Sequence, residues 1–277
     1  MAAAMNTAEN DRVPVPSPGA LTIASIPVNR PWQWLARGWD DIICARGASI
    51  FWGMLFAIMG LVVLFILHSV RLYNLALPLV AGFMLIAPIL AVGLYHVSRE
   101  LEKGNAVGVG TALGAWKRNT GQVALLGFAV GLLFLFWIRV ATLIFALFFG
   151  HRPPEAFGTA PPDLLGFIQS VILTTENIEF LVVGCVVGAG IALVVFAITA
   201  VSVPMLVDRE VSVFDAVVVS VRTVLQNKAA MILWAILIVL FTGAGILAGF
   251  IGLAVTMPLI AHATWHAYRD LVKTPSE

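Results

Sequence analysis

Six long apolar runs constrain this chain more than any other feature. They cover residues 49–68, 72–95, 123–149, 180–207, 229–247 and 249–265. Each approaches the ~20 residues that an α-helix needs to cross ~30 Å of hydrocarbon. Only 11% of the residues are charged, against about 25% in soluble domains, so a soluble fold could not bury this much apolar surface. The sequence therefore predicts an all-α membrane protein with six transmembrane helices.

The distribution of Lys and Arg predicts how these helices cross the membrane. If the N-terminus is cytoplasmic, most of the 16 basic residues fall on the cytoplasmic side, whereas Arg71 and Arg152 fall outside and Arg139 lies within a span. The positive-inside rule therefore predicts that both termini are cytoplasmic, in a multi-pass protein of the bacterial inner (cytoplasmic) membrane. In this topology Gly245, near the end of the fifth run, lies on the outer side. In the outer loop between the third and fourth runs, a short surface helix is expected over 164–175.

Composition divides the chain into a tail and one membrane domain. Residues 1–30 contain prolines and charges but no signal-peptide pattern, which predicts a disordered cytoplasmic tail. Residues 31–273 are then a single six-helix domain. Cys44 and Cys185 lie at different predicted depths, so we expect no disulfide. The net charge of +1 gives no reason to expect a nucleic-acid partner.

Comparison of the sequence with itself predicts three repeats of one unit. The end of the second run matches the end of the sixth run at an offset of 170 residues, and the segment before the first run matches the segment before the fifth at an offset of 182. Each unit is a cytoplasmic amphipathic helix followed by a transmembrane hairpin. The units cover about 31–103, 104–210 and 211–273. Their amphipathic segments, which should lie along the cytoplasmic interface, are 32–44, 106–116 and 214–226.

The chain also resembles a known family. The resemblance rests on Val-Asn-Arg-Pro-Trp at 28–32, on the Arg99–Glu100 and Arg269–Asp270 pairs, and on the helix count. Over roughly 26–272 these features are similar to uncharacterised bacterial six-helix integral-membrane proteins with a domain of unknown function, some of them described as related to cytochrome c oxidase subunit I. The family has no established activity, so the resemblance implies a fold but no substrate. No helix carries the cluster of deep histidines that haem and copper need, so we predict no cofactor.

Three histidines are candidate metal ligands. His262 and His266 lie one helical turn apart, and the repeat places His96 at the position equivalent to His266. However, His96 and His266 directly follow Tyr95 and Trp265, and such ring pairs commonly anchor helices at the membrane interface. We therefore favour an interfacial role over a metal site. His262, one turn deeper, does not fit the anchoring interpretation.

Charged residues within or at the ends of spans are the other candidates. Arg139 lies near the predicted outer boundary, where it could extend to the headgroups or pair with Glu176 or Glu179, or else contact an anionic substrate. Adjacent basic and acidic residues recur at three helix ends. Neighbouring residues on a helix do not face each other, so we expect a structural ring in which each charge pairs with the next repeat. These pairs are Arg99/Glu100, Arg209/Glu210 and Arg269/Asp270.

The polar residues cluster at the predicted interfaces rather than in the apolar core. This pattern favours a non-catalytic accessory, assembly or scaffold factor, with the lipid bilayer and either another membrane protein or a second copy of the chain as partners. The repeats and Pro88, Pro204 and Pro258, which should kink the even-numbered helices, favour an alternative. That alternative is a transporter or channel for a small or lipidic solute. An intramembrane enzyme or haem protein is the third hypothesis.

Overall fold

The fold is a helical bundle. The computed structural model describes residues 21–70, 75–115, 119–150 and 177–274. Within these residues, five helical stretches are long and apolar enough to cross a membrane. They are α2 (Arg46–Val70), α3 (Ala76–Leu90) with α4 (Val92–Glu102), α6 (Thr120–Phe149), α8 (Ile178–Thr199) with α9 (Ser202–Asp208), and α11 (Lys228–Leu247). The sixth apolar run forms α12 (Leu253–Leu271), which does not belong to this group.

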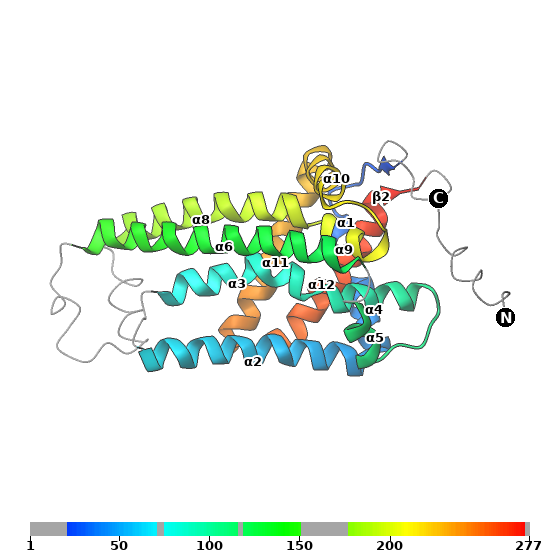
Figure 1. The fold of residues 1–277 in the computed structure, drawn as a ribbon, viewed down its shortest axis with the longest axis horizontal. Coiled ribbons are helices and arrows are strands. Elements are labelled where there is room, and N and C mark those ends of the chain that lie inside the picture. The colour runs from blue at the N-terminus through cyan, green and yellow to red at the C-terminus, as the bar shows by residue number, and fades with distance from the viewer. Residues whose placement is uncertain (1–20, 71–74, 116–118, 151–176, 275–277) are drawn as a thin grey trace, which may run out of the picture.

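The remaining elements gather at one end of the bundle, here called the polar end (Figure 1). They are α1 (Arg30–Cys44), α5 (Val109–Gly114), α10 (Val213–Gln226), β1 (Thr22–Ile23) and β2 (Val272–Lys273). The two strands pair antiparallel, Thr22 with Lys273, so both ends of the described chain lie at the polar end. Residues 22–30 were expected in a disordered tail, yet they include a strand and Ile26, whose N–H donates to Asn227 Oδ1 at 3.0 Å. The amphipathic helix expected over 106–116 is only the six-residue α5, because glycines interrupt this segment.

Side chains from other helices fill the breaks in two spans. The carbonyl of Leu90, at the junction of α3 and α4, accepts a hydrogen bond from Trp52 Nε1 at 2.8 Å. Near the junction of α8 and α9, Ser220 of α10 donates to the Ala197 carbonyl at 2.7 Å and accepts from the Val201 N–H at 3.1 Å. The Ser220 hydroxyl thus replaces the helical bond between these two backbone groups. These backbone groups at the helix breaks therefore form their hydrogen bonds within the protein.

Helices α11 and α12 form a hairpin whose tip contacts the middle of α2. The chain turns at Gly249 and Phe250, which have positive φ angles of 70° and 67°. A Cβ atom added at Gly60 of α2 would overlap the Phe250 ring. Gly60 lies about 21 Å along α2 from Arg46, and α2 continues for about 15 Å beyond it. The tip therefore ends well short of the far end of α2 (Figure 1).

The largest buried side chains pack around α12 at the polar end. Trp34 of α1 and Trp234 of α11 meet edge to face with ring centroids 5.6 Å apart, and neither is more than 1% exposed. Gly38 lets α1 approach α12 closely, because a Cβ atom at Gly38 would lie only 2.7 Å from the backbone nitrogen of Ala263 in α12. Such packing holds α12 between α1, α2, α4 and α11. The polar residues of α12 are thereby fixed in the interior.

Candidate functional site

A buried chain of hydrogen bonds links α12 to three other helices. His262 is fully buried, with Nε2 3.0 Å from Ser49 Oγ of α2 and Nδ1 2.7 Å from Ser98 Oγ of α4. Ser98 Oγ donates to Asp41 Oδ2 of α1 at 2.5 Å, and the same oxygen lies 3.0 Å from His266 Nε2. Because Ser98 gives its only hydrogen to the carboxylate, it accepts from His262 Nδ1–H, and in a neutral imidazole Nε2 then accepts from Ser49. The network thus selects one tautomer of a neutral His262.

Ser49, His262 and Asp41 follow the order of a nucleophile, a base and a carboxylate, with Ser98 between the base and the carboxylate. The surroundings do not suit catalysis, however, because Ser49 is 1% exposed and His262 0% exposed. A substrate has no access to Ser49 Oγ in this conformation. Every hydrogen-bonding atom named in the chain has a partner, so the network fixes the relative positions of α1, α2, α4 and α12.

A second cluster forms around Asp270, beyond the apolar part of α12. One carboxylate oxygen accepts from Arg30 Nε at 2.7 Å, Trp34 Nε1 at 2.8 Å and Arg37 Nη2 at 2.5 Å. Burial acts to raise the pKa of Asp270, but the hydrogen bonds from these three α1 residues outweigh it and lower the pKa to about 2. Asp270 therefore remains ionised and clamps α1 against the end of α12.

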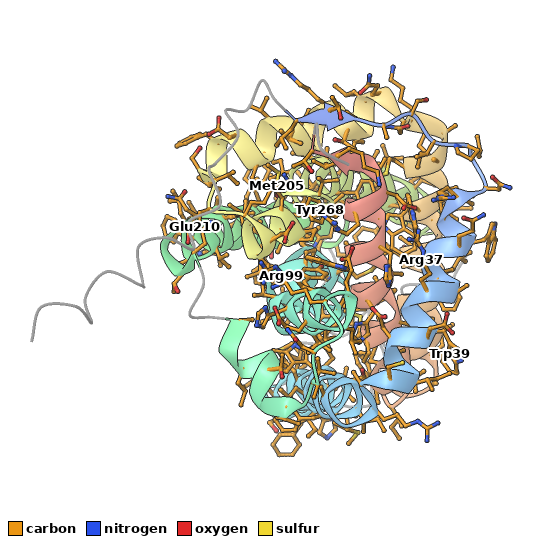
Figure 2. The ribbon with its side chains drawn as sticks, turned by 90° about the vertical axis from the view of Figure 1, so that its right-hand side faces the viewer. Arg37, Trp39, Arg99, Met205, Glu210 and Tyr268 are labelled. Atoms are coloured by element: carbon orange, nitrogen blue, oxygen red, sulfur yellow. The ribbon has the colours of Figure 1, made fainter. Side chains whose placement is uncertain are left out.

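A third cluster brings together Arg99 of α4, Arg209 directly after α9 and Arg269 of α12. Asp208 accepts from Arg99 Nε at 2.9 Å and from Tyr268 O–H at 2.8 Å. Arg209 Nε lies 3.6 Å and Arg269 Nη1 3.8 Å from the same carboxylate, and Arg209 Nε also donates to the Tyr268 oxygen at 2.7 Å. Viewed along the bundle, Arg99 and Tyr268 lie near its centre (Figure 2). Asp208 thus holds α4, α9 and α12 together.

The ring of charges has different members from those the sequence predicted. Arg99 does bond its neighbour Glu100, at 3.0 Å, whereas Glu210 is exposed and forms no ion pair within the described part of the chain. Arg269 instead pairs with Glu102 at 3.0 Å, and Glu102 also accepts from Trp265 Nε1 at 3.0 Å. Arg209 and Asp270 likewise use the partners described above. The arginines do pair with carboxylates of other helices, but Asp208 and Glu102 supply most of these carboxylates.

The interpretation of Tyr95 and Trp265 as anchors at the membrane interface is wrong. Tyr95 is 2% and Trp265 1% exposed, so both rings pack inside the protein rather than facing lipid headgroups. His266 also faces the interior of the protein, where it bonds Asp41, because α1 and α4 pack against α12. His96 lies on α4, near enough to Glu100 for an electrostatic interaction that favours the ionised carboxylate. No group of three His, Cys, Asp or Glu side chains suited to a metal ion occurs among the described residues.

Arg139 lies far from these clusters. It is exposed on α6, and the described residues, which include Glu179, provide no salt bridge to it. Glu176 and the helix expected over 164–175 lie outside the described residues, as do Arg71, Arg152 and residues 1–20 of the tail. Sequence reasoning missed Asp41, Ser49, Ser98, Glu102 and Asp208. Asp41 could have been found, because it lies seven residues after Trp34 and therefore on the same helical face.

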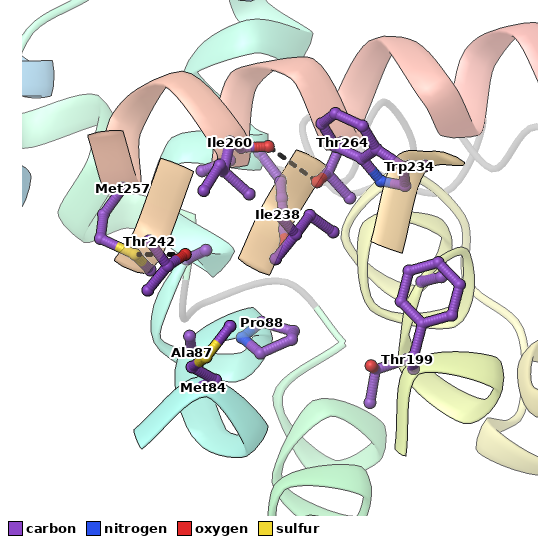
Figure 3. A pocket seen from close by; sticks show the side chains of 15 residues that line it. Met84, Ala87, Pro88, Thr199, Trp234, Ile238, Thr242, Met257, Ile260 and Thr264 are labelled. Atoms are coloured by element: carbon purple, nitrogen blue, oxygen red, sulfur yellow. Dashed lines mark hydrogen bonds between the residues drawn. The ribbon is translucent and has the colours of Figure 1, made fainter. Parts of the chain in front are cut away.

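A small apolar cavity lies on another side of α12 (Figure 3). Its volume is about 60 Å³, and its lining includes Met84 and Pro88 of α3, Thr199 of α8, Thr242 of α11 and Met257 of α12. Thr199 Oγ1 donates to its own helix, to the Val195 carbonyl at 2.8 Å. Ligand pockets usually measure about 300–1,000 Å³, so this cavity is too small for a typical organic ligand.

Comparison with known proteins agrees with the membrane assignment. The model of a family described as "Predicted integral membrane protein (DUF2189)" matches residues 75–208, which extend from the start of α3 to the end of α9. No curated protein and no solved structure matches the chain. Over residues 75–208 the chain is therefore similar to an integral membrane protein family of unknown function, as the sequence features indicated.

Proposed function

We propose that this protein is a non-catalytic accessory or scaffold factor of the bacterial inner membrane, and that α8 binds a transmembrane helix of another membrane protein. The observation that carries the proposal is how little of α8 is covered. Only 6% of the most apolar stretch of the α8–α9 span is buried by the described residues, against 22–39% for the other four spans. Val186, at 66% exposure, is among its most exposed side chains.

The surface of α8 suits close packing against another helix. A Cβ atom at Gly184 or Gly190 would meet nothing within 4 Å, whereas one at Gly188 would lie 2.9 Å from Trp137 of α6. One glycine is therefore used in packing within the protein, and two remain open. Small residues let transmembrane helices approach each other closely, which strengthens their van der Waals contact.

The interior of the protein gives less support to transport. In many transporters, unwound backbone carbonyls at broken helices bind ions. Here the Leu90 and Ala197 carbonyls at the breaks accept hydrogen bonds from Trp52 and Ser220 instead. The polar clusters around α12 are also internally bonded, and the cavity is small. These features support a structural role.

Photo-crosslinking tests the proposal. A photoreactive amino acid at Val186 should give a stoichiometric adduct with one specific membrane protein in intact membranes. The matched control is Phe65, which is 71% exposed and belongs to α2, the helix on the opposite side of the bundle from α8 (Figure 1). It should give only lipid adducts. Lipid adducts at both positions, together with solute flux in proteoliposomes containing only this protein, would contradict the scaffold role.

We also infer that the polar end is cytoplasmic and that the α11–α12 hairpin enters and leaves the membrane on that side. The position of its tip beside Gly60, midway along α2, supports this inference, and so does the charge distribution. In a background with Cys44 and Cys185 replaced by serine, Ala248→Cys at the exposed tip should resist an impermeant maleimide from either side. Pro161→Cys, in the predicted outer loop, should react from outside. Equal outside labelling of both variants would instead establish six complete crossings.

A further inference from the structure

Helix α1 presents a row of apolar side chains that no described part of the protein covers. Trp32, Ala36, Trp39 and Ile43 follow the spacing of one helical face. Trp32 is 55%, Trp39 47% and Ile43 45% exposed, and Ala36 is also exposed. We call this row the outer stripe of α1. Because it includes two indole rings, the stripe represents a large apolar area for a helix at the end of a bundle.

Helix α10 has an equivalent outer stripe at the offset of 182 residues. It consists of Phe214, Val218, Val221 and Leu225. Phe214 is 76%, Val218 47% and Leu225 59% exposed, while Val221 is half-buried. The two helices therefore expose the same positions of the same pattern. A shared environment explains this equivalence better than two unrelated partners.

The opposite faces of both helices are buried and polar in part. On α1 this inner face includes Trp34, Gly38 and Asp41, which contact α12 or bond its side chains. On α10 the equivalent residues include Ala216 and Ser220, both fully buried. Ser220 occupies the α8–α9 break, as described above. Each helix therefore uses one face for the protein and leaves a separate apolar face for its surroundings.

Both outer stripes continue into surfaces that face lipid. Only Ala45 separates α1 from the spanning helix α2, and only Asn227 separates α10 from α11. Exposed apolar residues resume at once on the spans, with Ile50 at 57% and Ile232 at 56% exposure. In the view along the bundle, α1 lies across the direction of the spans, at their periphery, with Trp39 on its outer side and Arg37 toward α12 (Figure 2).

We propose that α1 and α10 lie in the surface of the membrane that the protein spans, with both outer stripes inserted at the boundary between headgroups and acyl chains. The continuity of the stripes with the lipid-facing spans identifies the occupant as lipid. Tryptophan side chains are favoured at this depth, because the ring is apolar and the indole N–H is polar. Exposed Arg46 and Lys228, at equivalent positions beginning α2 and α11, lie beside headgroup phosphates in this arrangement. The proposal does not depend on the scaffold function.

Spin labels on the full chain in lipid nanodiscs test this arrangement. The labels are introduced one at a time at Ala36→Cys and Val218→Cys in the outer stripes, in a background with Cys44→Ser and Cys185→Ser. Asp40→Cys, at an exposed polar position of α1, is the matched control. Collisions with oxygen, which partitions into acyl chains, should dominate at both stripe positions. Collisions with a water-soluble nickel chelate should dominate at the control.

Two results would overturn the proposal. Nickel collisions at Ala36→Cys equal to those at Asp40→Cys would mean that the stripe faces water. Protection of the stripe labels from both reagents would mean that protein covers the stripe. Because neither readout depends on α8, a failed crosslink at Val186 would leave this test unaffected. Oxygen-dominated collisions at both stripe positions would support the proposal.

Discussion

Asp208→Asn is expected to lower the free energy of unfolding by about 3 kcal/mol, the largest effect that we expect from removing one charge. Asp208 is the carboxylate nearest to Arg99, Arg209 and Tyr268, and its side chain is only 16% exposed. Arg99 and Arg209 are 12% and 13% exposed, so water would replace the lost charge poorly. The neutral amide would remove the carboxylate nearest to Arg209, whereas Arg99 and Arg269 would keep Glu100 and Glu102. The measurement is the shift in thermal unfolding midpoint in detergent.

Glu210→Gln is the matched control for this substitution. Glu210 lies two residues further along the chain but is exposed, so its neutralisation should change the free energy of unfolding by less than about 0.5 kcal/mol. Figure 2 shows Glu210 toward the periphery, away from Arg99 and Tyr268. Equal shifts for the two variants would mean that the Asp208 cluster contributes no more than an ordinary surface charge.

The sequence was sufficient to predict the class of fold. Long apolar runs identify membrane helices because the thickness of the hydrocarbon layer sets their length, and the structure has a helix in each run. The same criterion could not predict where the α11–α12 hairpin ends. The depth of its tip depends on contacts with Gly53 and Gly60 of α2, and these contacts join segments that are distant in sequence. The threefold repeat remains a prediction.

The candidate site was only partly predictable, for a similar reason. The recurring Arg–acid pairs drew attention to Arg99, Arg209 and Arg269, which the structure places together around Asp208. Arg99 does bond Glu100, the other member of its pair, at 3.0 Å, but the pairs did not predict the partners that Asp208 and Glu102 supply. The second carboxylate that Arg99 bonds, that of Asp208, is 109 residues away in the sequence. His262 stood out because of its depth, but nothing in the sequence distinguishes its two partners, Ser49 and Ser98, from other serines.

Gly53→Ala should destabilise the protein by about 3 kcal/mol through overpacking. A Cβ atom at this position would overlap the backbone carbonyl of Ala254, at the start of α12. Backbone cannot move aside as a flexible side chain can, so α2 and α12 would have to separate. That separation would also strain the bond between Ser49 and His262, since Ser49 lies one turn before Gly53. The expected result is a lower unfolding midpoint in detergent.

Gly47→Ala separates this packing effect from the general effect of alanine in a helix. Gly47 lies in the first turn of the same helix, and a Cβ there would meet nothing within 4 Å. Alanine is favoured over glycine in helix interiors by about 0.5–1 kcal/mol, so the midpoint should stay the same or rise. If Gly53→Ala were equally harmless, α12 would not be held against α2 at this depth. The hairpin would then have to extend further along α2, and its tip would no longer lie beside Gly60.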